Sequence, residues 1–189
     1  MLNQLAHQDK YMKLSTYDKS DAEQIRHLFT KVFSDSEDQA EGLLIGRLAF
    51  DLMKNTDAQD IHGFIATENK QIIGSIFFTR LAFESTDNAF ILGPVAIHTS
   101  HQGKGIGQKL IKFGINDLKE NGVELVFTYG DPDFYSKVGF RRITEKTAKA
   151  PFELSQPEGW LCQSLVDDEI RPIAGNSRCV EALGKPEYW

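Results

Sequence analysis

Cysteine is scarce in this sequence: Cys162 and Cys179 are the only two among 189 residues, and no CxxC pair occurs. Two well-separated thiols in a chain of this length could form a bridge, but they are more typical of a protein from a reducing compartment. The first residues, MLNQLAHQDKYMKL, lack the apolar run of a signal peptide, and no segment approaches membrane-spanning length. We therefore expect a cytoplasmic protein without a membrane partner.

An excess of positive charge is also missing. The chain has 21 Lys and Arg against 27 Asp and Glu, a net charge of -6, which argues against a nucleic-acid partner held through broad phosphate contacts. The acidic balance favours a cationic partner or simply serves solubility. With 41% hydrophobic and 25% charged residues, the chain can bury a core without disulfides or a structural metal. We expect one domain over residues 1–189, with a loose leader (1–9), a core (10–150) and a tail (151–189).

The pattern of apolar residues predicts a mixed α/β protein without internal repeats. Four segments have helical spacing, and we expect helices that start at residues 22, about 38 and 106 and a short one over 131–138. Ser20 and Asp21 offer N-cap oxygens to the first helix. Seven segments have strand patterns: 10–17, 61–68, 72–83, 89–98, 123–129, 140–146 and 159–166. Asn69-Lys70, between the second and third of these segments, predicts a hairpin turn. The rest of the tail is loop-rich.

A glycine cluster opens the third helix. In HQGKGIGQKLI, residues 101–111, three glycines alternate with Lys104 and Ile106: Gly103, Gly105 and Gly107. A helix N-terminus presents unpaired N–H groups and partial positive charge, so glycines there would let a phosphate approach the backbone. No Walker A string GxxxxGK[ST] is present, and the dinucleotide motif GxGxxG fails at Gln108. The alternative is a glycine-rich turn that merely joins a strand to a helix.

The strand before this cluster contains Gly93-Pro94 inside an otherwise apolar run. Because proline cannot donate to a central ladder, we expect a bulge that frees the main-chain groups of residues 95–97. Free main-chain groups just before a phosphate cradle suit a ligand with an amide-rich arm that ends in a pyrophosphate. Coenzyme A is such a ligand.

These residues resemble the GNAT superfamily of N-acetyltransferases. The family signature Q/R-x-x-G-x-G/A matches residues 102–107, and the element FYxKxGF matches residues 134–140, separated by one helix and one strand. Within the superfamily, LGPVAIHTSHQGKGIG followed by GDP and FY is similar to a group of small bacterial acetyltransferases related to YhbS. The resemblance covers roughly residues 10–150.

The resemblance implies a mostly antiparallel central sheet with flanking helices, in which acetyl-CoA lies between splayed strands 89–98 and 123–129. The cofactor-binding residues that it implies are Val95, Ala96, Ile97, Gln102, Gly103, Lys104, Gly105, Ile106 and Gly107. We expect no metal, because His98 and His101 have no nearby cysteine or carboxylate cluster.

Tyr135 falls where many family members place a general acid, although it could instead only pack against the sheet. A tyrosine hydroxyl can protonate the departing thiol and then recover the proton. Some members carry a glutamate base where this chain has Ile91, which leaves Glu37, Glu41, Glu84 and His98 as candidates. Thr128 replaces the asparagine that the family usually has on the strand before the FY helix.

The sequence therefore predicts an acetyl-CoA-dependent N-acetyltransferase, with direct attack by a primary amine of a small molecule or protein. One alternative is a longer acyl chain, which the volume around Leu92 and Phe127 would decide. Others are a non-catalytic acyl-CoA sensor and a nucleotide-binding regulatory domain. Exposed strands near the C-terminus could pair in a homodimer. Residues 175–189, ending in Tyr188 and Trp189, either border the acceptor pocket or cover the core.

Overall fold

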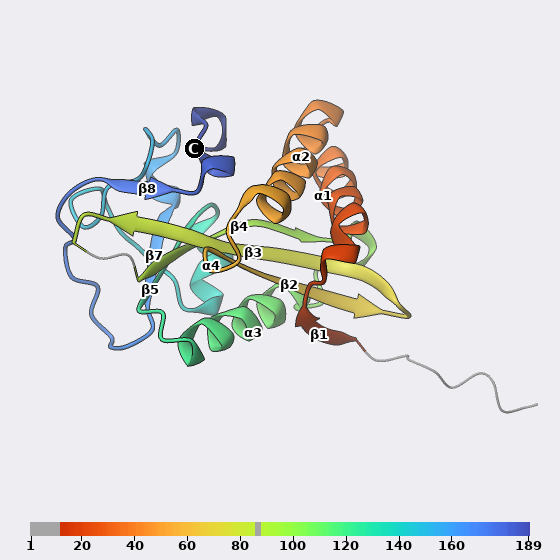
Figure 1. The fold of residues 1–189 in the computed structure, drawn as a ribbon, viewed down its shortest axis with the longest axis horizontal. Helices are drawn as coiled ribbons and strands as arrows, with labels where there is room; N and C mark the ends of the chain where they lie inside the picture. The colour runs from red at the N-terminus through yellow and green to blue at the C-terminus, as the bar shows by residue number, and fades with distance from the viewer. Residues whose placement is uncertain (1–11, 86–87) are drawn as a thin grey trace, which may run out of the picture.

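The computed structural model describes residues 12–85 and 88–189, so the expected leader and the first residues of the predicted strand 10–17 lie outside it. One sheet runs in the order β1-β2-β3-β4-β5-β7-β6, and β8 pairs with β3 (Figure 1). The strands are β1 Lys13–Thr16, β2 Ile61–Glu68, β3 Gln71–Phe83, β4 Ala89–Ile97, β5 Leu125–Tyr129, β6 Arg141–Arg142, β7 Trp160–Ser164 and β8 Ser177–Cys179. Neighbouring strands are antiparallel except β4 and β5, which are parallel. The predicted, mostly antiparallel mixed sheet is confirmed.

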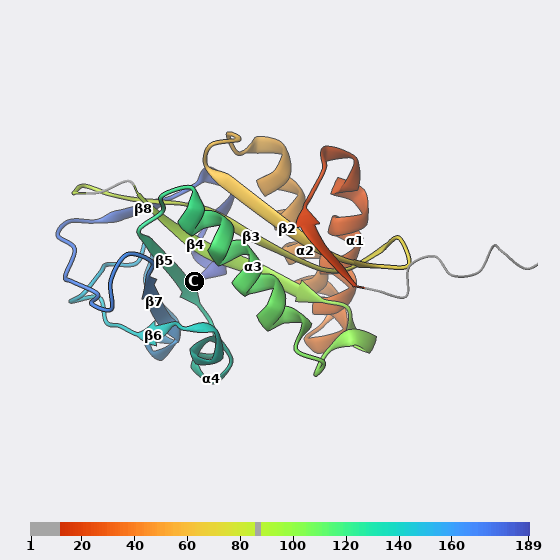
Figure 2. The same cartoon turned by 90° about the horizontal axis from the view of Figure 1, so that it is seen from below.

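Helices cover both faces of the sheet. They are α1 Ala22–Ser36, α2 Gln39–Asn55, α3 Ile106–Glu120 and the short α4 Pro132–Tyr135. The α1–α2 pair lies on one face together with the C-terminal end of the chain, and α3 crosses the opposite face (Figures 1 and 2). None of the helices in the described part of the chain has the length and apolar character that crossing a lipid bilayer demands.

The first helix starts as predicted, but its cap is different. Asp18 Oδ1 accepts a hydrogen bond from Ser20 N at 2.9 Å, and Asp21 Oδ2 accepts one from Asp18 N at 2.8 Å. This capping box opens a short 3₁₀ turn ahead of α1. Asp21 is the N-cap residue of α1 itself, but its side chain makes no capping hydrogen bond to that helix. At α2 the side chain of Asp38 accepts from Glu41 N at 2.9 Å, which fixes the predicted start.

Two glycines let α1 and α2 approach each other closely. A Cβ atom at Gly42 would collide with Ser34 Oγ, and one at Gly46 would collide with Thr30 Oγ1. Side chains at these positions would push the helices apart. The close contact holds the end of α1 and the start of α2 as one unit above the sheet.

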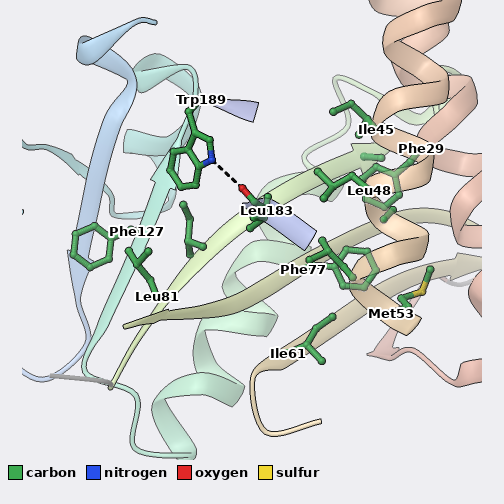
Figure 3. Packing of buried hydrophobic residues seen from close by; sticks show 14 of the residues in the cluster. Phe29, Ile45, Leu48, Met53, Ile61, Phe77, Leu81, Phe127, Leu183 and Trp189 are labelled. Carbon is green, nitrogen blue, oxygen red and sulfur yellow. Dashed lines mark hydrogen bonds between the residues drawn. The ribbon is translucent and has the colours of Figure 1, made fainter. Parts of the chain in front are cut away.

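Each face of the sheet has its own hydrophobic core. On the α1–α2 face, Phe29 stacks on Phe77 with ring centroids 5.9 Å apart, and the same core continues to Trp189 near the C-terminus (Figure 3). On the α3 face, the rings of Phe64 and Phe78 meet edge to face at 6.0 Å beneath the helix. A sheet covered on both faces explains why its central strands are almost continuously apolar.

Three sequence expectations for turns and strands had mixed outcomes. The hairpin turn at Asn69-Lys70 is confirmed, and both residues have positive φ (51° and 65°). The strand predicted at 140–146 shortens to β6, because Thr147 N bonds back to Thr144 O at 2.8 Å and turns the chain away. The tail contains a strand that sequence patterning missed, since β8 pairs with residues 81–83 of β3.

The two cysteines are not bonded to each other. Cys162 is buried on β7, and its burial raises the pKa of the thiol to about 12. Cys179 is half-buried on β8, and burial also raises the pKa of its thiol. Both therefore stay protonated at neutral pH.

We expect Gly114→Ala to destabilise the protein, although alanine is the better helix former. A Cβ at Gly114 would lie 2.5 Å from Phe78 Cε2 and 2.9 Å from Phe64 Cδ2, so α3 would have to move away from the sheet. Overpacking of this kind costs about 1–3 kcal/mol. Urea unfolding measures the loss in the free energy of unfolding. Asn116→Ala, at an exposed position of the same helix, is the control. Equal stability of the two variants would contradict the close packing at Gly114.

Candidate active site

The pairing of β4 with β5 ends partway along β4. The two strands pair from Ala89–Leu125 to Leu92–Thr128, and the buried Thr128 Oγ1 donates a hydrogen bond to Leu92 O at 3.0 Å. Beyond this point Gly93 and Pro94 lie opposite the single residue Phe77, because the register shifts between Phe78↔Leu92 and Ile76↔Val95. The predicted bulge is confirmed, and it begins where β4 and β5 separate.

Main-chain groups of β4 face the gap beside this bulge. His98 N donates to Ile73 O of β3 at 2.8 Å. Since hydrogen-bonded pairs alternate along an antiparallel ladder, Ala96 also directs its main-chain groups toward β3, whereas Val95 and Ile97 direct theirs away from it. Ile97 O accepts a hydrogen bond from Gln102 Nε2 at 3.0 Å. Gln102 therefore ties the glycine segment to the end of the strand.

The glycine segment forms an open turn at the start of α3. Gly103 and Gly105 have φ of 73° and 74°, and a Cβ at either would meet nothing within 4 Å. Backbone conformation, rather than crowding, therefore calls for glycine here. Gly105 is the N-cap, and no side chain caps the helix, so the first N–H groups of α3 stay available for an anion.

Gly107 has a different role in the same segment. A Cβ there would lie 3.3 Å from Phe134 Cζ and 3.5 Å from Ile97 Cγ1. The small residue lets α4 pack beside the first turn of α3. In this segment, Gly103 and Gly105 are therefore required by their backbone conformation, and Gly107 is required by close packing.

A cavity of about 480 Å³, which we call the cradle cavity, lies over this turn. Its lining includes Gly103, Gly105 and Lys137. Lys104 Nζ donates instead to Ser100 O at 3.0 Å. Lys137 is the lysine of the FYxKxGF element. We did not include it among the candidate anion-binding residues expected from the sequence, although its place in that element could have indicated it.

A larger cavity of about 750 Å³, the splay cavity, opens between the separated strands. It shares Val95, Gln102 and Phe134 with the cradle cavity, so the two adjoin. Its walls come from the end of α1, the start of α2, the bulge, the β5–α4 connection and the C-terminal residues.

Tyr135 lines the splay cavity from α4. Its half-buried ring meets Phe134 and Phe140 edge to face, at centroid distances of 5.1 and 5.7 Å, and a Cβ at Gly130 would lie 2.8 Å from it. Burial raises the pKa of Tyr135 above its ordinary value of 10.0, and the neighbouring Thr128 opposes part of this rise. The hydroxyl therefore stays protonated at neutral pH and can act as a proton donor.

Among the four candidate bases, Glu41 lines the splay cavity. Glu37 is exposed at the end of α1 and belongs to neither cavity lining. Glu84 Oε1 accepts from Asn176 N at 3.5 Å, beside the β8 segment, and His98 Nδ1 lies 2.9 Å from Ser100 Oγ. The structure thus brings Glu41, but not the other three, into the cavity that contains Tyr135.

Residues 59–142 match the family model of the acetyltransferase (GNAT) domain. The chain contains a GNAT acetyltransferase domain. Its sequence is 29% identical over 170 residues to the uncharacterised N-acetyltransferase YjhQ of Escherichia coli K12, covering 87% of this chain and 90% of YjhQ.

Solved GNAT structures share the fold. The structure of YhbS from Escherichia coli in complex with CoA superposes with a TM-score of 0.76 at 23% identity, over 95% of this chain and 96% of that one. A GNAT acetyltransferase from Brucella melitensis in complex with acetyl-CoA gives a TM-score of 0.72 at 22% identity, over 92% and 98%.

The C-terminal residues of the chain both cover the core and border the cavity. The buried Trp189 stacks on Tyr129 at a centroid distance of 6.3 Å and donates through Nε1 to Leu183 O at 3.1 Å (Figure 3). Leu183, Tyr188 and Trp189 also line the splay cavity. The tail therefore covers the core, as one of the two alternatives held, and also lines this cavity.

Two sequence expectations about the site need comment. Phe127 lies in the core, stacked on Trp160 with ring centroids 5.2 Å apart, and does not line the splay cavity as Leu92 does. Across the described residues, no group of three or more His, Cys, Asp and Glu is placed to hold a metal ion.

Thr128→Val should destabilise the protein by about 1–3 kcal/mol, because it leaves the buried carbonyl of Leu92 without its donor. Urea unfolding is the measurement. Thr128→Ser, which keeps the hydroxyl, serves as the control and should lower the free energy of unfolding less than Thr128→Val does. A valine variant as stable as the serine variant would show that the hydrogen bond contributes nothing.

Proposed function

We propose that this GNAT protein, acting as one domain over residues 1–189, transfers the acetyl group of acetyl-CoA to a primary amine by direct attack in a ternary complex. The observation that carries the proposal is the pair of adjoining cavities. One has an uncapped helix N-terminus that suits a pyrophosphate, and the other is lined by the half-buried side chain of Tyr135. A donor that reaches from the first into the second would bring its thioester beside Tyr135.

The relatives support the choice of cofactor, since YhbS was solved with CoA and the Brucella melitensis enzyme with acetyl-CoA. Acetyl-CoA supplies the activated acetyl group as a thioester. The N–H groups at the start of α3 would hold its pyrophosphate, with charge from Lys104 and Lys137. The outward main-chain groups of Val95 and Ile97 would pair with the amide-rich arm, while Gln102 and Ala96 keep that strand in place.

Tyr135 acts as the general acid in this proposal. The amine must be neutral to attack, and alkylammonium groups have an ordinary pKa of about 10.4, so the ammonium group releases one proton to solvent before the reaction. As the C–N bond forms and the C–S bond breaks, Tyr135 protonates the departing sulfur and regains a proton released by the attacking nitrogen. Main-chain N–H groups at the bulge would stabilise the developing oxyanion.

Gly105→Glu should weaken the binding of acetyl-CoA and CoA at least about tenfold, since a carboxylate would occupy the anion site. Gly122→Glu is a matched control at the other end of α3, where φ is 78° and nothing lies within 4 Å of an added Cβ. Both variants carry the strain of a left-handed residue, so only the cradle distinguishes them. Isothermal titration measures the affinities, with ATP and NAD as comparison ligands.

Near-wild-type affinity of Gly105→Glu for acetyl-CoA would contradict the cradle assignment. Tighter binding of ATP or NAD than of CoA by the wild-type protein would instead indicate a nucleotide-binding domain.

Tyr135→Phe should lower kcat by about 10²–10⁴-fold, the usual contribution of a general acid, with little change in acetyl-CoA affinity. Burial disfavours the tyrosinate and raises the pKa of Tyr135, so the wild-type rate should show no fall from loss of this acid until the pH exceeds 10. Steady-state kinetics against pH provide the measurement. Equal losses of kcat and of affinity would assign Tyr135 to binding.

A further inference from the structure

The acceptor side of the splay cavity is built by elements outside the stretch that matches the family model. Residues 59–142 match the model, whereas α1, α2 and the C-terminal segment lie before or after it. The 3₁₀ turn Glu181–Leu183 packs against α2, and this contact joins the two walls.

These walls are mostly apolar and partly aromatic. The side chains that α1, α2 and the C-terminal segment contribute include Phe33, Ile45, Leu48, Leu183, Tyr188 and Trp189. The volume of about 750 Å³ suits a ring-sized body beside the acetyl-bearing arm. A polyhydroxylated amine would leave most of its hydroxyl groups without partners on such walls, and unpaired polar groups are costly to bury.

The charged residues of the cavity have one sign. Glu41, Asp131 and Glu187 line it, and no Lys, Arg or His is among its lining residues in the described part of the chain. Such a lining attracts an ammonium group and disfavours a ligand that brings a carboxylate of its own.

Of these three carboxylates, Glu41 is the one whose side chain is available to bind a ligand. Glu187 lies 3.6 Å from Lys185 Nζ, and Asp131 Oδ1 accepts from Asp133 N at 2.8 Å. The side chain of Glu41 has no hydrogen bond or ion pair with any described residue, while its main-chain N–H is fixed by the cap of α2.

We propose that the acceptor is a small primary amine on an apolar, ring-sized body without a carboxylate, and that Glu41 binds its ammonium group. This inference rests on the proposed acetyl transfer. It makes the free amino acid a poor substrate and the corresponding decarboxylated amine a good one. The C-terminal segment then acts as a specificity wall.

The test compares tryptamine with tryptophan, which differ only by the carboxylate, and adds kanamycin and a lysine-containing peptide as other acceptor types. Mass spectrometry of the acetylated product measures the rates. We expect kcat/KM for tryptamine to exceed that of each other acceptor at least about tenfold, the effect of one charge contact of about 1.4 kcal/mol. A preference for tryptophan, kanamycin or the peptide would overturn the proposal.

Glu41→Gln should raise the KM for tryptamine about tenfold and leave the KM for acetyl-CoA unchanged. The ratio of kcat/KM for tryptamine to kcat/KM for tryptophan should fall. Glu37→Gln removes the same charge four residues earlier, outside the cavity lining, and should behave as wild type. Glu41→Asp should restore part of the affinity, and circular dichroism confirms that each variant is folded. An unchanged KM in Glu41→Gln would remove Glu41 from the acceptor site.

The two levels of proposal fail differently. If no amine is acetylated and acetyl-CoA does not bind, the proposed function itself is wrong. If acetyl-CoA binds and other amines are acetylated in preference to tryptamine, or if acetyl-CoA binds and tryptamine does not bind to the CoA complex by isothermal titration, only the acceptor class is wrong.

Discussion

The separation of β4 from β5 is the constraint on which the rest of the site depends. Thr128 secures the last pair of the two strands, and immediately afterwards the bulge at Gly93-Pro94 changes the register against β3. From there one side of β4 stays in the ladder with β3, while no strand of the described residues pairs with its other side. A continuous pairing would have consumed the outward groups of Val95 and Ile97 in ordinary sheet hydrogen bonds.

The walls of the cavity at this gap are positioned by packing contacts that lie outside the cavity itself. Gly42 and Gly46 bring α1 and α2 together, so the helix ends form one wall. Trp189 anchors the opposite wall through its stack on Tyr129 and its bond to Leu183. These walls come from opposite ends of the chain, and β3 reaches toward both because it supports the α1–α2 core and pairs with β8.

Sequence reasoning predicted the features whose signals are local. The glycines at 103 and 105, the bulge at Gly93-Pro94 and the starts of α2 and α4 each depend on residues within one turn or strand. It missed features that depend on partners far along the chain. The strand β8 exists because β3 offers it an edge, and Glu41 differs from Glu37 only through where the fold places each carboxylate.

The protection of the two cysteines has a practical consequence for assays. Reagents that report free coenzyme A by disulfide exchange react with thiolates, and both Cys162 and Cys179 are held as thiols by burial. The protein's own thiols should therefore add little background to a continuous colorimetric measurement of the proposed activity. The buried Cys162 is in addition shielded from alkylating agents in the folded protein, so a gain in its labelling would report unfolding rather than turnover.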